Sequence, residues 1–496
     1  MKSKKLPNIV FIILDSARRD LFGFYGDNRT LTPYLDSLAK KSLVMNDHYA
    51  SGCGSAQAHV SLFLGQHSSR HGVVHNMSEM KEDVVALPKI LKEVGYKTYG
   101  HCMASFIPPA GYEDLFGFDE FYYPGKAGTS VRKSFRNILL DRLKKSPVAW
   151  NFTKNLYKSI RGQAAITRSS AQSLDGKASL DYLYEKLIDN NDTSPVFAYT
   201  TLLHPHTPYS PPQWCIDKVF KDNKVNSKAY DIQANMHAWV NGDMGDAIDG
   251  IESMKMLYEA EMLYADSLMK EFVQKLEKNN ILKDTILVIT SDHGEMLGEH
   301  GQLNHGATVW EEIYRLPAII YSERHFSQGK YYNNISSGLD LYPTLLDMIG
   351  KLNYANELTI LDGLPLNNDE YSDPNRYLVV DAPPLVLPER LKKYPKLVAN
   401  GSTFYRAVRD LNFKYIWKSN GEQLLYKVGD YEKPENNIYK SNKSVADEMF
   451  KKMTKYYSDI DSAYDIKTYT INMGATAAKK MTNPLIQKEL KKLGYM

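Results

Sequence analysis

The chain has 496 residues, of which 43% are hydrophobic and 24% charged, with a formal net charge of +3 at pH 7. This length allows a large buried core, and this composition excludes a wholly disordered chain. No segment approaches the roughly 18 apolar residues of a membrane-spanning helix. The pattern is typical of a soluble globular protein, and no nucleic-acid partner is expected.

The N-terminal segment and the cysteines bear on the compartment. The first apolar run covers six residues, Ile9 to Leu14, and ends in Asp15 and two arginines without a small-residue cleavage site. A buried strand over 8–14 fits better than a signal peptide. Three scattered cysteines without a CxxC motif predict neither a disulfide framework nor a cysteine-based zinc site. A cytoplasmic location is therefore expected. The cysteines are Cys53, Cys102 and Cys215.

Short β-branched runs alternate with helical patterns along the chain. A helix that ends near Gly95 and leads into a strand is expected over 89–100. This repeated strand–helix–strand order predicts an α/β protein with a mainly parallel sheet. The other expected elements are strands at 8–14, 195–203, 284–292 and 316–321 and helices at 32–42 and 254–278.

Two regions depart from this alternation. Residues 126–168 contain eleven Lys or Arg and one acid, which fits either a solvated helical insertion or contact with an anionic surface. After about residue 385, alternating strands with a turn at Asn420-Gly421 indicate an antiparallel sheet. We therefore expect a catalytic domain over 1–385 with a basic helical insertion, and a C-terminal α+β subdomain over 386–496 that ends in a helix.

Residues that follow predicted strands offer ligands for a divalent cation. In "TSDHGEMLGEHG", Asp292 and His293 follow a hydrophobic strand, and Gly294 and Gly298 permit close backbone approach. Asp15 ends the first strand, where a buried carboxylate needs a partner. Each could instead cap a helix. Together, Asp15, Asp292 and His293 form an O/O/N ligand set for a hard or borderline divalent cation.

The stretch "SGCGSAQAHVSLFLGQHSSRHG", residues 51–72, gathers candidate nucleophiles at the start of a predicted helix. A hydroxyl nucleophile needs a base or a metal, and a helix N-terminus favours developing negative charge. Ser55 stands immediately ahead of the helical pattern. It could also be an N-cap, Ser61 a buried helix residue and Cys53 a packed small hydrophobic residue. Spacing alone does not choose among them.

Two further stretches place histidines beside predicted strands. "LLHPHTPYSPP" (202–212) has His204 and His206 on either side of a proline, and "NHGATVWEE" has His305 before a glycine. A single histidine is more often structural than catalytic. Several His and Asp residues at the strand ends of one α/β chain indicate a functional site, because such ends gather at one edge of a parallel sheet.

These motifs together resemble the sulfatase family of the alkaline phosphatase superfamily. The resemblance runs in family order through "PNIVFIILDSARRDLFGFYG", "SAQAHVSLFLGQHSSRHGV", "HPHTPY", "ITSDHGEMLGEHG", "HGATVWEEIYRLPAIIY" and "GLDLYPTLLDMIG". "RAVRDLNFKYI" and "LKKLGYM" resemble the family's C-terminal subdomain. The resemblance implies an alkaline-phosphatase-like α/β/α sandwich with a small C-terminal α+β subdomain.

The family motif distinguishes the nucleophile candidates. Its reactive residue lies ten positions before the glycine of a Leu-x-x-Gly run, and Gly65 leads back to Ser55. The resemblance also implies that Asp15, Asp292 and His293 bind a metal ion, with Ser55 Oγ completing the site. We expect one divalent ion, Mn, Ca or Zn, with Mg less favoured.

Other matched positions concern the substrate. His206 and His305 match positions that bind the non-bridging oxygens of the ester or protonate the leaving group. His59 falls where many sulfatases have arginine. Asn76 matches a residue that contacts those oxygens in some relatives. The resemblance therefore implies that Ser55, His206 and His305 are catalytic and that His59 and Asn76 bind substrate.

The chain also departs from the family pattern. Sulfatases that convert Cys or Ser to formylglycine carry C/S-x-P/A-x-R, whereas residues 55–59 are Ser-Ala-Gln-Ala-His. Ser16 replaces a second ligand Asp, and Met103 and Ser105 stand where a Lys-x-His pair is usual. The chain resembles a sulfatase-like branch with an unmodified Ser or Thr nucleophile, and formylglycine is not expected.

These observations predict a metal-dependent hydrolase of sulfate or phosphate esters of small molecules or glycans, acting through a covalent Ser55 intermediate. A plain serine cannot expel sulfate by re-forming a carbonyl, so turnover needs a second displacement. Two alternatives stay open. One is a phosphodiesterase or a transferase of a phospho-headgroup onto a glycan or lipid, and the other is a metal-binding pseudoenzyme or scaffold.

Overall fold

The computed structural model describes most of the chain. The predicted basic insertion at 126–168 and the predicted helix at the C-terminus lie outside the described residues. Those residues are 5–74, 78, 84–102, 113–122, 169–189, 194–221, 223–245, 249–385 and 391–459.

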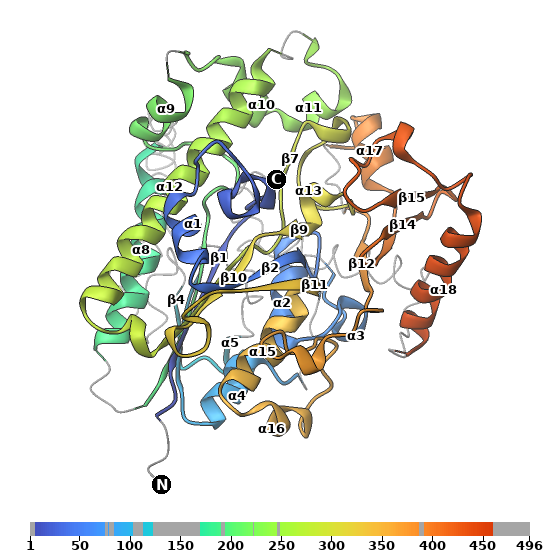
Figure 1. Ribbon diagram of the computed structural model, residues 1–496. Helices are drawn as coiled ribbons and strands as arrows, with labels where there is room; N and C mark the ends of the chain where they lie inside the picture. The colour runs from blue at the N-terminus through green and yellow to red at the C-terminus, as the bar shows by residue number, and fades with distance from the viewer. Residues whose placement is uncertain are drawn as a thin grey trace, which may run out of the picture.

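The main sheet of the described residues has nine strands (Figure 1). They are β1 (Asn8–Leu14), β2 (Ser42–Tyr49), β3 (Lys97–Cys102), β4 (Glu120–Tyr122), β5 (Val196–Leu202), β6 (Thr285–Thr290), β9 (Arg315–Leu316), β10 (Ala318–Tyr321) and β11 (Lys330–Ser337). Their order is β11-β2-β10-β6-β1-β5-β3-β4, with β9 paired to β2. β1 pairs in parallel with β5 and β6, whereas β10 runs antiparallel to β2 and β6. The predicted α/β class with a mainly parallel sheet is confirmed.

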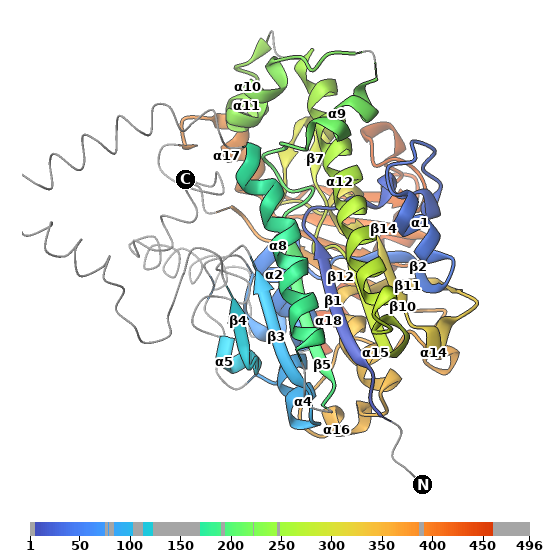
Figure 2. The ribbon, with the colours of Figure 1, turned by 90° about the vertical axis from the view of Figure 1, so that its left-hand side faces the viewer.

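Helices cover both faces of this sheet. One face carries α1 (Pro33–Ala39), α8 (Ser169–Ile188) and α12 (Gly250–Lys278), and Figure 2 views the molecule with α8 and α12 in front of the strands. The other face carries α2 (Ser55–Leu64), α4 (Leu87–Glu93) and α15 (Leu341–Met348). The result is the predicted α/β/α sandwich.

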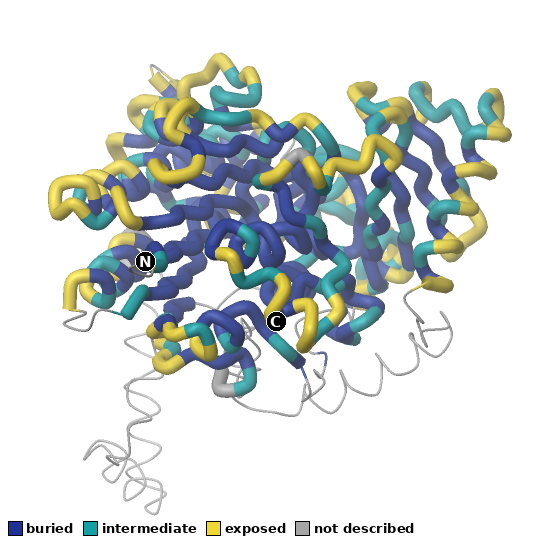
Figure 3. The backbone as a smooth tube through the Cα atoms, turned by 60° about the horizontal axis from the view of Figure 1, so that its bottom comes forward, coloured by how far each residue is buried: buried dark blue, intermediate teal, exposed yellow. Residues whose placement is uncertain are grey.

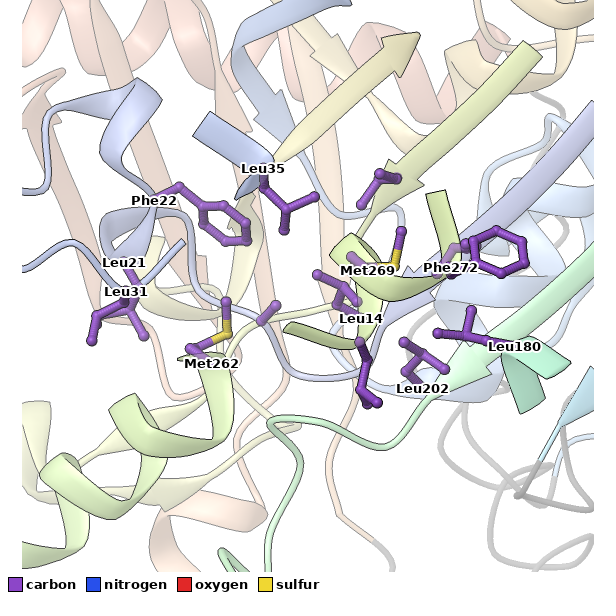
Figure 4. Packing of buried hydrophobic residues seen from close by; sticks show 14 of the residues in the cluster. Leu14, Leu21, Phe22, Leu31, Leu35, Leu180, Leu202, Met262, Met269 and Phe272 are labelled. Carbon is purple, nitrogen blue, oxygen red and sulfur yellow. The ribbon is translucent and has the colours of Figure 1, made fainter. Parts of the chain in front are cut away.

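Strand β1 is apolar on both faces of the main sheet. Its side chains alternate between two hydrophobic clusters, because successive residues of a strand point to opposite faces. Leu14 packs in the first cluster with Leu202 of β5 and Met269 of α12 (Figure 4). Burial on both faces is typical of a central parallel strand and produces the continuous hydrophobic run in the sequence. Figure 3 shows this buried centre enclosed by exposed loops and helix edges.

A second, antiparallel sheet lies beside the main one. Its strands are β12 (Leu378–Ala382), β13 (Tyr405–Arg409), β14 (Phe413–Lys418) and β15 (Gln423–Lys427), in that order. The predicted turn at Asn420-Gly421 joins β14 to β15, and Gly421 has a positive φ of 91°. Helix α18 (Lys443–Asp459) packs on this sheet through Met449 and Met453. The sheet takes its edge strand β12 from residues that precede the expected boundary at 385.

The remaining elements are short. They are α3 (Ser68–His71), α5 (Glu113–Phe116), α9 (Gln213–Phe220), α10 (Lys228–Ala234), α11 (Met236–Asn241), α13 (Glu311–Tyr314), α14 (Glu323–Phe326), α16 (Leu352–Asn356), α17 (Pro395–Gly401), β7 (Met296–Leu297) and β8 (Leu303–Asn304). Among the helices of the described ranges, none combines the length and the apolar character that crossing a bilayer requires. The cytoplasmic location stays a prediction.

Candidate active site

The candidate site lies where three adjacent strands of the main sheet end. β6, β1 and β5 are neighbours and run in parallel, so their carboxyl ends share one edge. Asp292 and His293 follow β6, Asp15 follows β1, and His206 follows β5. Topology alone therefore brings together residues that are separated by up to 278 positions in the chain.

Asp15, Asp292 and His293 form a buried cluster that could hold a metal ion. One ligand atom from each lies within 4.8 Å of the other two. His293 Nε2 is 3.3 Å from Asp292 Oδ2 and 3.9 Å from Asp15 Oδ1. Two carboxylate oxygens and one imidazole nitrogen are a suitable set for a divalent cation.

Hydrogen bonds orient Asp292 toward this cluster. Its Oδ1 accepts the backbone N–H groups of His293 at 2.9 Å and Ser16 at 3.2 Å. Ser16 has a positive φ of 64°, unusual for a residue with a side chain, which turns its N–H toward the carboxylate. Asp292 Oδ2 is buried and has no hydrogen-bond partner. A buried carboxylate oxygen without a donor fits a bound cation, because such burial otherwise costs free energy.

The neighbouring backbone also sets the tautomer of His293. Its Nδ1 donates to the carbonyl of Gly294 at 2.9 Å, so the lone pair of Nε2 faces the cluster. A Cβ at Gly294 would lie 1.9 Å from the carbonyl oxygen of Glu312, so no larger residue fits there. The glycine after the Asp-His pair thus permits the close approach that the sequence predicted.

The two carboxylates of the cluster differ in acidity. Burial, followed by the charge of Asp292, raises the pKa of Asp15 well above its ordinary value. Burial alone would raise the pKa of Asp292 as well, but His293 and His59 lower it overall. Two buried carboxylates this close disfavour double ionisation, and a bound cation would offset that repulsion.

Ser55 is the candidate nucleophile that faces this cluster. It is the first residue of α2, after the N-cap Gly54, and its hydroxyl donates to His293 Nε2 at 3.0 Å. The Ser61 hydroxyl instead accepts a hydrogen bond from His71 Nε2 at 2.8 Å. Burial raises the pKa of Cys53 to about 11, which disfavours a thiolate. Geometry therefore separates the three candidates that spacing left open.

The predicted catalytic histidines form a row beside Ser55. The ring centroids of His293 and His305 are 4.1 Å apart, and those of His305 and His206 are 5.1 Å apart. Burial, followed by the neighbouring His206, lowers the pKa of His305 to about 3. His204 lies elsewhere, with its Nδ1 2.6 Å from Glu261 Oε2. Of the two histidines around Pro205, one thus adjoins the cluster and the other pairs with helix α12.

His59 lies under the nucleophile with no exposed surface. Its Nδ1 donates to the carbonyl of Ser55 at 2.7 Å, and its Nε2 accepts from Thr201 Oγ1 at 3.2 Å. Thr201 Oγ1 is in turn 2.7 Å from the hydroxyl of Tyr199. Direct contact of His59 with substrate would require it to exchange one of these bonds. Asn76 lies outside the described residues.

Sequence reasoning missed Glu295 and the role of Gln57. Glu295 is fully buried, and its Oε1 lies 3.4 Å from Nδ1 of His305. Burial raises the pKa of Glu295 to about 7. The signal was present in "SDHGE", where Glu295 follows Asp292 and His293 after the strand, but the direction of its side chain depends on the turn after Gly294.

Comparison with known proteins identifies the family of this chain. The sulfatase family model matches residues 7–351. The chain belongs to the sulfatase family. It is 25% identical over 378 residues to an arylsulfatase of Clostridium perfringens (strain 13 / Type A), covering 69% of this chain and 74% of that protein. It is 24% identical over 398 residues to an N-acetylglucosamine-6-O-sulfatase of Bacteroides thetaiotaomicron, covering 70% and 68%.

The fold has a close counterpart among solved structures. A phosphonate monoester hydrolase of Agrobacterium radiobacter superposes with a TM-score of 0.67 at 18% identity, covering 92% of this chain and 96% of that one. The alkaline-phosphatase-like fold inferred from the motifs is thus confirmed. As a member of the sulfatase family, the chain is a hydrolase of the sulfuric or phosphoric ester class.

Proposed function

We propose that this sulfatase-family protein is a metal-dependent hydrolase in which unmodified Ser55 attacks a sulfate or phosphate ester. The observation that carries the proposal is the position of Ser55 Oγ, 3.0 Å from His293 Nε2 at the start of α2. This hydroxyl adjoins the cluster of Asp15, Asp292 and His293. Ser55 is also the first residue of α2, and a helix N-terminus favours developing negative charge.

The residues of the cluster would hold one divalent ion, Mn, Ca or Zn, with Mg less favoured. The two carboxylates suit Mn or Ca, and the imidazole suits Zn. When bound, the ion would lower the pKa of the Ser55 hydroxyl and neutralise charge on the ester oxygens. Asp292 offers Oδ2, which has no hydrogen-bond partner, and His293 offers Nε2. Ser55 Oγ and Asp15 complete the expected set.

The chain's own groups then account for both halves of the reaction. Ser55 Oγ forms a bond to phosphorus or sulfur while the bond to the leaving oxygen breaks, and His206 or His305 takes up the proton of the Ser55 hydroxyl and passes it to this oxygen. The imidazoles of the row and the amides of α2 stabilise the charged oxygens. Water then attacks the same central atom and gives a proton to the same histidine, which returns it to Ser55 Oγ as this oxygen leaves. His59 and Asn76 are proposed to support the ester oxygens.

A small molecule or a glycan is the expected substrate. The relative in B. thetaiotaomicron is an N-acetylglucosamine-6-O-sulfatase, and a fold neighbour is a phosphonate monoester hydrolase. The second candidate function is a phosphodiesterase, or a transferase of a phospho-headgroup onto a glycan or lipid. The sequence at 55–59 favours it, because a serine that stays unmodified must be freed by a second displacement, which phosphoryl groups undergo readily.

One panel tests the proposal. Aryl sulfate, phosphate, phosphodiester and phosphonate esters are offered to the wild type and to Ser55→Ala with Mn, Ca, Zn or Mg. We expect turnover by the wild type with at least one class, loss of turnover in Ser55→Ala, and an intact mass that shows no oxidation of Ser55. Full activity of Ser55→Ala would exclude this nucleophile, and a formylglycine mass would exclude the unmodified serine.

A further inference from the structure

The side chain of Gln57 contacts the loop that leads into the nucleophile, residues 51–55, which is called the nucleophile loop below. Gln57 is 1% exposed, and its Oε1 accepts the backbone N–H of Cys53 at 3.0 Å and the Cys53 thiol at 3.5 Å. Its Nε2 donates to Ser68 Oγ at 3.0 Å and to the carbonyl of Asp381 at 3.2 Å. Both ends of this buried amide are therefore satisfied by fixed partners.

The loop packs tightly around this amide. A Cβ at Gly52 would lie 2.6 Å from Cγ of Gln57, so the backbone there touches the side chain directly. Ser51 Oγ donates to the carbonyl of Ala58 at 3.0 Å, which draws the start of the loop back over the first turn of α2. Ser55 thus follows directly after a loop whose backbone packs against the side chain of Gln57.

The partner of Gln57 on the second sheet is Asp381, which several other hydrogen bonds also hold in place. Asp381 of β12 is 2% exposed, and its carbonyl also accepts the Tyr314 hydroxyl at 2.8 Å. Its carboxylate accepts from Ser69 Oγ at 3.0 Å, Arg406 Nε at 3.2 Å and Tyr457 Oη at 2.5 Å. Gln57 therefore connects the nucleophile loop to the C-terminal sheet, through a hydrogen bond between residues that are 324 positions apart in the sequence.

We propose that Gln57 is a positioning residue that aligns Ser55 for attack by tying its loop to Asp381 of the second sheet. The proposal rests on Ser55 being the nucleophile. In the formylglycine pattern the same position is Pro or Ala, neither of which carries a side-chain amide. A serine that attacks directly needs tight alignment, since a misplacement of about 1 Å can cost roughly 10²-fold in rate.

The test compares full-length variants with bis(4-nitrophenyl) phosphate and 4-nitrophenyl sulfate as probes. Gln57→Met keeps the volume and removes every hydrogen bond, so we expect kcat to fall about 10²-fold with KM little changed. Ser68→Ala removes one acceptor and should give a smaller fall in kcat. It carries the test if Gln57→Met does not fold.

Tyr457→Phe is the matched control. It removes a hydrogen bond to the carboxylate of Asp381 in the same interface but leaves the carbonyl that binds Gln57. We expect this variant to lose thermal stability and to keep the wild-type kcat. An equal loss of kcat in Tyr457→Phe and Gln57→Met would overturn the proposal, because it would show only a loosened interface.

Two other results separate this inference from the proposed function. Wild-type kcat in Gln57→Met, or a rise in KM alone, while Ser55→Ala is inactive would overturn the positioning role and leave Ser55 as the nucleophile. Full activity of Ser55→Ala would overturn the proposed function itself, and the positioning role with it.

Discussion

The two halves of the candidate site are held in different ways. The cluster of Asp15, Asp292 and His293 follows the ends of adjacent parallel strands, so the hydrogen-bonded ladder of the main sheet positions its backbone. The nucleophile loop lies off that sheet, and side-chain hydrogen bonds from Gln57 connect it to β12. The candidate metal cluster is thus assembled by topology, whereas we propose that individual polar contacts position Ser55, so the two halves should fail separately.

The largest expected effect comes from breaking the metal half. Asp292→Asn replaces a buried carboxylate of the cluster whose Oδ2 has no hydrogen-bond partner. We expect loss of bound metal by mass analysis and a fall in activity of about 10³-fold or more. Ser55→Ala should lose activity while keeping most of the metal, because Asp15, Asp292 and His293 remain. An Asp292→Asn protein that retained stoichiometric metal would contradict this assignment.

Substitutions in the row of histidines test which side chain gives a proton to the leaving oxygen. If His305 supplies the proton, His305→Gln should lower kcat by about 10² to 10⁴-fold for an alkyl ester and much less for a 4-nitrophenyl ester, whose leaving group needs no proton. His204→Gln is the control, since His204 pairs with Glu261 outside the cluster. It should reduce stability rather than kcat. Equal losses with both esters would assign His305 to binding instead.

A substitution in the apolar core next to Asp15 should have an effect of intermediate size. Leu14 is fully buried and immediately precedes Asp15. Leu14→Ala should reduce the free energy of unfolding by about 2–5 kcal/mol, because it leaves a cavity between β1, β5 and α12. Chemical denaturation measures this loss. Activity of the folded protein should fall too if strand β1 positions Asp15, and unchanged activity would separate packing from the site.

The smallest expected effect concerns charges where the main sheet meets the second sheet. Glu311 lies 3.0 Å from Lys414, and although burial would raise its pKa, Lys414 and Arg409 lower it to about 2. A carboxyl with a depressed folded pKa stabilises the fold fully above its ordinary pKa of 4.5 and loses this contribution as the pH falls toward 2.

Glu311→Gln should therefore lower the Tm at neutral pH and flatten its decline in acid, as measured by thermal melts between pH 7 and pH 3. Leu14→Ala should shift the Tm at every pH without changing that slope. A Glu311→Gln variant whose Tm declines in acid as steeply as that of the wild type would show that other carboxyls govern this region.

Much of the fold follows from local pattern. The strand predicted at 8–14 is β1, the helix predicted at 254–278 lies within α12, and the helix-then-strand over 89–100 is α4 followed by β3. These elements could be predicted because burial on both faces makes a continuous apolar run and burial on one face makes a helical period. The order of strands in the sheet needed the structure.

The candidate site divides along the same line. The strand ends place Asp15, Asp292 and His293 together by a general rule of parallel sheets, so the sequence alone pointed to this cluster. The directions of His59 and His204 did not follow from the sequence. Whether a histidine after a strand faces the site or pairs with a helix depends on one turn of backbone and on which partner packs there.

By itself, the sequence determined the family, the fold class and the residues that can act as ligands, because these depend on residue type, order and short-range spacing. Only the tertiary structure decided which hydroxyl faces the ligand cluster, that Glu295 lies beside His305, and that Gln57 connects α2 to β12. The contacts of Ser55 with His293 and of Gln57 with Asp381 join residues 238 and 324 positions apart, so tertiary packing rather than any local preference sets their geometry.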